Sequence, residues 1–161
     1  MKKYLILIIV AIIVLVLIIA CLLIFFKMTK FQKSGEIVSF EFGEWNWWTF
    51  SDTYKIYKSG DNVFFEKLGF EGWYDDSIEP KIAVVYPEIL TDLTKVVFED
   101  KVNRRDGFDK INKHVLDWTS WHLYITFENG DHLSANGYMR HPNNYQKVKG
   151  DFISIISKFS E

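Results

Sequence analysis

The chain has 161 residues and a formal net charge of −2, and 17% of its residues are aromatic. From Ser34 onward it carries 14 basic and 21 acidic residues. An acidic domain repels nucleic acid, so we expect no nucleic-acid partner. The one cysteine, Cys21, precedes this part of the chain, which excludes a disulfide framework and a cysteine-based metal site there.

The first 33 residues differ in character from the rest. Residues 4–26 contain no charged side chain and are nearly all Leu, Ile, Val, Ala or Phe, and lysines flank them on both sides. A helix needs about 20 such residues to cross the roughly 30 Å apolar core of a bilayer. The pattern predicts a membrane anchor and juxtamembrane link over residues 1–33, with an uncleaved transmembrane helix at about 4–26. The protein is then a single-pass protein of the cell membrane.

Two other interpretations of this segment stay open. A cleaved signal peptide is disfavoured because the apolar run is long and no small-residue cleavage site follows it. Ile18-Ile19-Ala20-Cys21 resembles the lipobox of bacterial lipoproteins, in which Cys21 would be lipidated, although the apolar run continues past it. Otherwise Cys21 is a small apolar side chain in the helix. The flanking lysines are nearly balanced, and the lipobox favours a domain outside the cytoplasm.

Residues 34–161 are expected to form one domain. Alternating apolar and polar residues, with a turn signal at Ser59–Asn62, predict short strands over residues 38–42, 54–56, 63–65 and 81–86. Pro87 and Glu88 are typical of the first turn of a helix, and apolar residues follow at helical spacing as far as Val97.

A hairpin is predicted over residues 119–137. A two-residue Asn129-Gly130 turn would mix its apolar and polar faces. A three-residue loop instead pairs Ile125 with Leu133 and Leu123 with Ala135, which keeps one face apolar. We therefore expect a type I turn in which Gly130 is left-handed and forms a G1 bulge.

The chain should end in a helix. Asn143 followed by Gln146 fits a variant of the capping box, and apolar side chains recur on one face from Tyr145 to Phe159. Because strands and helices do not alternate as β-α-β units, the predicted class is α+β. An N-terminal transmembrane helix would be followed by a small antiparallel sheet packed with two helices.

The last third of the chain has a familiar pattern. The run from Trp121 to Gly130 reads W-x-L-x-I-x-F-x-x-G, and Ala135-Asn136-Gly137-Tyr138 and then Pro142-Asn143-Asn144-Tyr145 follow it. This pattern resembles uncharacterised bacterial membrane-anchored or lipoprotein domains, in which such a hairpin leads into a final helix. The resemblance implies a fold and no activity.

No catalytic pattern is present, and we expect neither a metal site nor a cofactor. The predicted register places His122 and His132 on the polar face, two residue pairs apart, which does not favour a shared zinc ion. Sequence signatures of nucleotide-binding loops, zinc proteases and serine hydrolases are missing. The acidic run Asp75–Glu79 beside Trp73 offers carboxylates near aromatic rings, although such runs are more typical of solvated loops.

The density of aromatic residues near Trp45 is the remaining signal. In an extended strand Trp45 and Trp47 share one face and Trp48 lies on the other, and a two-layer domain cannot easily bury both faces. These three rings are the candidate binding surface for a glycan, peptide or protein partner. Alternatively they cover the edge of the core or lie in the membrane interface.

We therefore expect a non-enzymatic, membrane-tethered binding or interaction module. The alternatives are a small envelope enzyme or enzyme inhibitor that uses the loop from Trp73 to Glu79, and an accessory subunit of a membrane complex.

Overall fold

The computed structural model describes residues 4, 12–23, 33–46, 52–69, 81–112 and 119–159. It divides the chain into two compact units, Met1–Gln32 and Lys33–Glu161. In the first unit, residues 12–23 are helical and Cys21 is exposed.

The predicted membrane anchor is corrected by this structure. In the described part of the chain, no helix combines the length and the apolarity that a membrane span needs. For the residues that the structure describes, the predicted transmembrane helix at 4–26 and the single-pass membrane location are therefore wrong, and the extracytoplasmic placing of the domain, which depended on that anchor, loses its basis. Residues 5–11 and 24–26 of the expected span lie outside the described residues.

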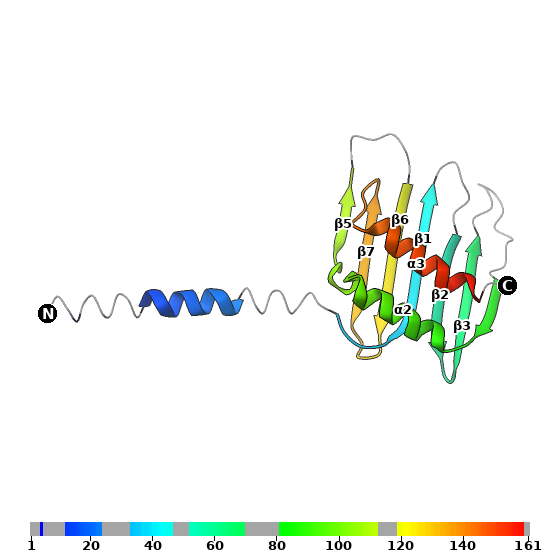
Figure 1. Ribbon diagram of the computed structural model, residues 1–161, viewed down its shortest axis with the longest axis horizontal. Coiled ribbons are helices and arrows are strands. Elements are labelled where there is room, and N and C mark those ends of the chain that lie inside the picture. The colour runs from blue at the N-terminus through cyan, green and yellow to red at the C-terminus, as the bar shows by residue number, and fades with distance from the viewer. Residues whose placement is uncertain are drawn as a thin grey trace. The chain divides into compact units, whose positions relative to one another are not determined.

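The second unit is built on a seven-stranded sheet with the order β4-β3-β2-β1-β6-β7-β5 (Figure 1). Its strands are β1 (Ile37–Asn46), β2 (Asp52–Ser59), β3 (Asn62–Gly69), β4 (Lys81–Val85), β5 (Phe108–Ile111), β6 (Thr119–Phe127) and β7 (His132–Tyr138). Neighbouring strands are antiparallel except that β5 runs parallel to β7. The sheet is thus mixed, which corrects the expected small antiparallel sheet. β5 gives no clear sequence signal, because the strand has only four residues and three of them are exposed.

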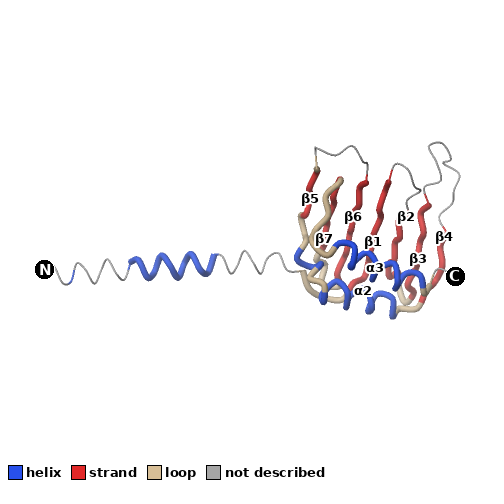
Figure 2. Tube along the Cα trace, turned by 45° about the horizontal axis from the view of Figure 1, so that its top comes forward, coloured by secondary structure: helices blue, strands red, loops and turns tan. Residues whose placement is uncertain are grey.

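Two α-helices lie on the same face of the sheet, as Figures 1 and 2 show from two directions. They are α2 (Glu88–Glu99) and α3 (Tyr145–Ser157), and a 3-10 turn, η1 (Val102–Arg104), follows α2. Their apolar stripes cover the alternate apolar residues of the central strands. Phe152 of α3 illustrates the packing. The centre of its ring lies 4.9 Å from that of Phe40 and 5.8 Å from that of Phe42, and both pairs are arranged edge to face.

The β6–β7 hairpin confirms the predicted register. Ile125 pairs with Leu133 and Leu123 with Ala135. Gly130 has a φ of 83°, its N–H donates to the Phe127 carbonyl, and the Phe127 N–H donates to the Asp131 carbonyl. This is the type I turn with a G1 bulge that the buried face requires.

The predicted capping box of the last helix is wrong. The residue before α3 is Asn144, which is left-handed with a φ of 60°, and no side chain caps the helix. The Asn144 side chain instead accepts a hydrogen bond from Arg105, 39 positions earlier in the chain. The first turn of α3 therefore keeps backbone N–H groups without a side-chain partner.

Candidate functional site

The face of the sheet opposite α2 and α3 is free of helices in the described part of the domain (Figure 2). Strand alternation places Glu41, Gly43 and Trp45 of β1 on this face, since Phe40 and Phe42 point into the core. By the same alternation His122 and Tyr124 of β6 lie beside them. Polar and aromatic side chains are thus presented on a rigid sheet.

A shallow hollow of about 460 Å³ opens on this face over β5, β6 and β7. We call it the sheet hollow, and its lining residues are Glu41, Asp109, Ile111, Ser120, Trp121, His122, Tyr124, Asn136, Gly137 and Tyr138. Tyr124 is 43% exposed, and its hydroxyl donates to the Asn136 side-chain oxygen at 3.2 Å. None of these lining residues is a lysine or an arginine.

His122 occupies a place that a glycine makes available. A Cβ atom at Gly43 would lie 2.3 Å from His122 Cε1 and 2.6 Å from Thr53 Oγ1, so the imidazole lies across β1 only because position 43 has no side chain. In this position the His122 Nε2 atom lies 3.4 Å from Glu41 Oε1. The Nε2 atom is buried, and it forms no hydrogen bond of good geometry with any of the described residues. Burial lowers the pKa of His122, and the Glu41 carboxylate partly opposes that shift. The imidazole is therefore mostly neutral near pH 7.

A second hollow, of about 490 Å³, lies where β5 meets the start of α3. We call it the cationic hollow, and it is lined by Asp100, Lys101, Arg105, Phe108, Lys110, Arg140, His141, Pro142, Asn143 and Asn144. Four of these ten residues carry permanent positive charges and one is a carboxylate. Burial lowers the pKa of His141, the nearby Glu44 raises it, and Lys149 lowers it.

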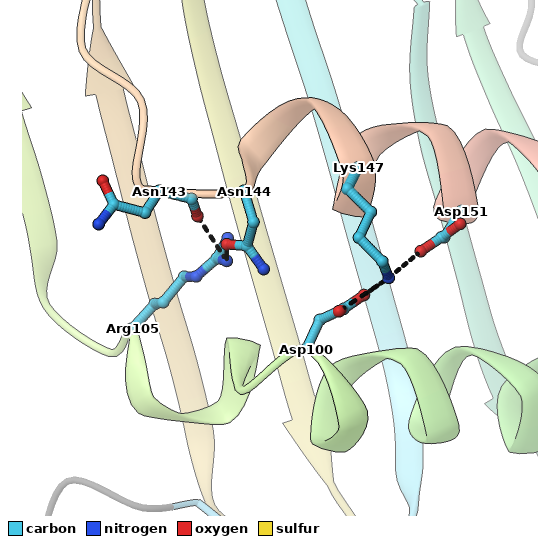
Figure 3. Close-up of polar contacts among 6 residues, drawn as sticks. All are labelled: Asp100, Arg105, Asn143, Asn144, Lys147 and Asp151. Carbon is cyan, nitrogen blue, oxygen red and sulfur yellow. Dashed lines mark hydrogen bonds and ion pairs between the residues drawn. The ribbon is translucent and has the colours of Figure 1, made fainter.

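Figure 3 shows how polar side chains join the end of α2 to the start of α3. Lys147 Nζ lies 2.7 and 2.8 Å from the two oxygens of Asp100 and 2.8 Å from Asp151. These ion pairs raise the pKa of Lys147. Arg105 donates to the Asn143 carbonyl at 3.3 Å and to the Asn144 side chain.

The residues predicted from the sequence are only partly placed. Trp45 is half-buried at the end of β1, opposite Ser120 of the sheet hollow. Trp47 and Trp48 lie outside the described residues, as do His114 and the loop from Trp73 to Glu79. Among the residues that are described, no three His, Cys, Asp or Glu side chains are grouped so that they could hold a metal ion.

Neither hollow follows from the sequence patterns. His122 and Asn136 face each other as expected, yet nothing in the local pattern shows that Gly43 of another strand accommodates the imidazole. The Arg104-Arg105-Asp106 run is typical of a solvated loop. Instead Arg105 binds the start of α3, and Asp106 accepts a hydrogen bond from the Ser134 N–H at 3.0 Å.

Comparison of the chain with protein-family models, with curated proteins and with solved structures gives no match.

Proposed function

We propose that the domain is a non-enzymatic binding module that holds a carbohydrate on the helix-free face of its sheet. The observation that supports this proposal is the sheet hollow, which combines an exposed aromatic ring with hydrogen-bonding side chains. With a volume of about 460 Å³, this open hollow offers a surface on which a ligand would lie, and it does not enclose the ligand. The ligand would lie against the Tyr124 ring and exchange hydrogen bonds with the polar side chains around it.

The chemistry of the lining favours a neutral ligand rich in hydroxyl groups. Glu41 and Asp109 carboxylates accept hydrogen bonds from hydroxyl donors, while Asn136 and Ser120 both donate and accept. An anion would meet two carboxylates and no permanent cation in this lining. A purely apolar ligand would leave these polar groups without partners, which is costly.

Trp45 extends the same surface beyond the hollow. It lies on the helix-free face, two residues along β1 from Gly43, and it pairs with Ser120, which lines the hollow. Aromatic rings on rigid strands offer a large contact area with little loss of conformational entropy. A ligand longer than one sugar ring would therefore reach Trp45.

The test is a titration with neutral oligosaccharides built from glucose or N-acetylglucosamine, followed by calorimetry and by amide chemical shifts. We expect saturable binding, with the largest shifts at residues 120–124 and 134–138. Removing the ring in Tyr124→Ala should weaken binding about fivefold, because an aromatic contact of this kind contributes about 1 kcal/mol.

Tyr86→Ala is the matched control, since Tyr86 is 74% exposed and lies outside the sheet hollow. It should bind as the unchanged protein does. Equal losses in the two variants, or no saturable binding of any of these sugars, would reject the proposal.

A further inference from the structure

The cationic hollow brings together two segments that are distant in the sequence. Lys101 and Arg105 belong to the link between α2 and β5, and Arg140 and His141 to the link between β7 and α3. Between them Phe108 and Lys110 of β5 face the helix side of the sheet, because they pair with Ala135 and Gly137 of β7. The parallel edge strand thus closes one side of the hollow.

The cationic hollow is positively charged, whereas the domain as a whole is negatively charged. Residues 34–161 carry a net charge of −7, yet Lys101, Arg105, Lys110 and Arg140 line one hollow together. The single carboxylate in the lining, Asp100, is bound through both oxygens by Lys147, which lies outside the lining. Positive charge therefore predominates in the hollow.

Three of these four cations have no acidic partner in the described part of the chain. No ion pair joins Lys101, Lys110 or Arg140 to a carboxylate there, and Lys110 lies 5.4 Å from the centre of the Phe108 ring. Arg105 binds a carbonyl and an amide oxygen, both of them neutral. Gathering like charges costs free energy unless a counter-charge joins them.

A neighbouring helix start adds to this positive potential, and a neighbouring histidine offers a hydrogen-bond donor. The first turn of α3 adjoins the hollow at Asn144, and no side chain caps its N–H groups. The start of a helix carries a partial positive charge and favours anions. The centre of the His141 ring lies 4.3 Å from that of Tyr145, with the two ring planes tilted by 39°, and His141 lines the hollow, where a ring N–H can donate.

We propose that the cationic hollow is a second binding site, distinct from the sheet hollow, and that it takes the diphosphate group of a small organic anion. Two arginines offer forked donors that match phosphate oxygens, and two lysines supply further charge. A single carboxylate would leave most of this charge unpaired, whereas a diphosphate carries enough negative charge to meet it. The volume of about 490 Å³ leaves room for an organic body beside Phe108 and Pro142.

The test uses the full chain and inorganic pyrophosphate as the probe, at constant ionic strength, with inorganic phosphate and sulfate in parallel. We expect saturable binding of pyrophosphate, tighter than that of phosphate or sulfate, with amide shifts at residues 101–105 and 140–147. The double variant Lys101→Gln/Arg140→Gln should bind at least about tenfold more weakly, because each charged contact of this kind is worth a factor of about ten or more.

The matched control is Lys58→Gln/Lys158→Gln, which removes the same charge from two exposed lysines outside the hollow. It should bind pyrophosphate within about twofold of the unchanged protein, since it changes only the general field. The melting temperature of both variants checks folding, and neither should fall much, because none of the four side chains makes an ion pair in the described residues.

Equal weakening in the two double variants would show a general charge effect and overturn the site. The site would also be overturned if the amide shifts were confined to other parts of the domain. The same conclusion would follow if sulfate and pyrophosphate bound with equal affinity, or if pyrophosphate binding did not saturate. The sugar titration and the pyrophosphate titration concern different hollows, so the failure of one leaves the other standing.

Discussion

Gly137→Ala tests the packing of Trp121 against β7 and against the backbone of Arg140. Gly137 lies in β7 opposite Trp121, which is 4% exposed. A Cβ atom at position 137 would lie 2.2 Å from Trp121 Nε1 and 2.1 Å from the Arg140 carbonyl oxygen. These two groups are themselves joined by a hydrogen bond of 2.8 Å. The methyl group would therefore push apart a donor and an acceptor that belong together.

The expected cost follows from two contributions. Overpacking a well-filled region costs about 1–3 kcal/mol. A buried indole N–H that loses its acceptor costs about 1–3 kcal/mol more. Replacing glycine by alanine also stabilises the folded state by up to about 1 kcal/mol, because it reduces the conformational entropy of the unfolded chain. We expect a loss of about 3–4 kcal/mol in the free energy of unfolding, a large part of the 5–15 kcal/mol of a typical domain.

Gly43→Ala is the matched comparison. Its Cβ atom would also meet atoms at 2.3 and 2.6 Å, but these belong to the His122 and Thr53 side chains. Both side chains are only half-buried and can rotate towards solvent, so the loss should be about 1 kcal/mol. Urea unfolding followed by far-ultraviolet circular dichroism measures both losses. If Gly137→Ala were no more destabilising than Gly43→Ala, the packing of Trp121 described above would be wrong.

Three further predictions concern the core, pH and a buried amide. Phe152→Ala should cost about 3–5 kcal/mol in urea unfolding, because it empties the space against Phe40; a loss under 1 kcal/mol would contradict this packing. Because the pKa of His122 is lower in the folded protein than in the unfolded chain, the unfolded chain takes up a proton first as the pH falls. The contribution of His122 to the free energy of unfolding is therefore present above about pH 6.5 and is lost as the pH falls towards the pKa of the folded state. His122→Gln should make this decline shallower, and an unchanged slope between pH 7 and 5 would refute it. Asn103→Ala should lower the free energy of unfolding by about 1–2 kcal/mol, because Asn103 is 1% exposed and its side chain donates a hydrogen bond to the Lys33 carbonyl at 3.0 Å. Thermal unfolding measures this loss, and an unchanged melting temperature would show that this hydrogen bond does not contribute to stability.

Much of the domain could be predicted from local patterns. The register of Ile125 with Leu133 follows from alternation and a nearby Gly130, and both signals lie within one short segment. The apolar stripes of α2 and α3 are likewise local, and their buried residues agree with the 3.6-residue period. Such features depend on neighbours along the chain, which the sequence displays directly.

The predictions that proved wrong relied on composition or on the spacing of a few neighbouring residues. Residues 4–26 have the composition of a membrane span, but hydropathy measures solvent preference and does not establish a helix of sufficient length. Asn143 and Gln146 have the spacing of a capping box, yet Asn144 is left-handed and its side chain is held by Arg105. The distant contact prevailed over the local signal.

What the sequence by itself determined is the set of strands and helices with strong periodicity, the acidic excess of residues 34–161 and the missing catalytic signatures. Only the tertiary structure decided that β5 joins β7 in parallel, that His122 lies over Gly43, and that Lys101 and Arg140 line one hollow. The physical reason is the range of the contacts. Periodicity encodes which face of an element is buried, whereas a site is made by residues tens of positions apart that meet only when the sheet has formed.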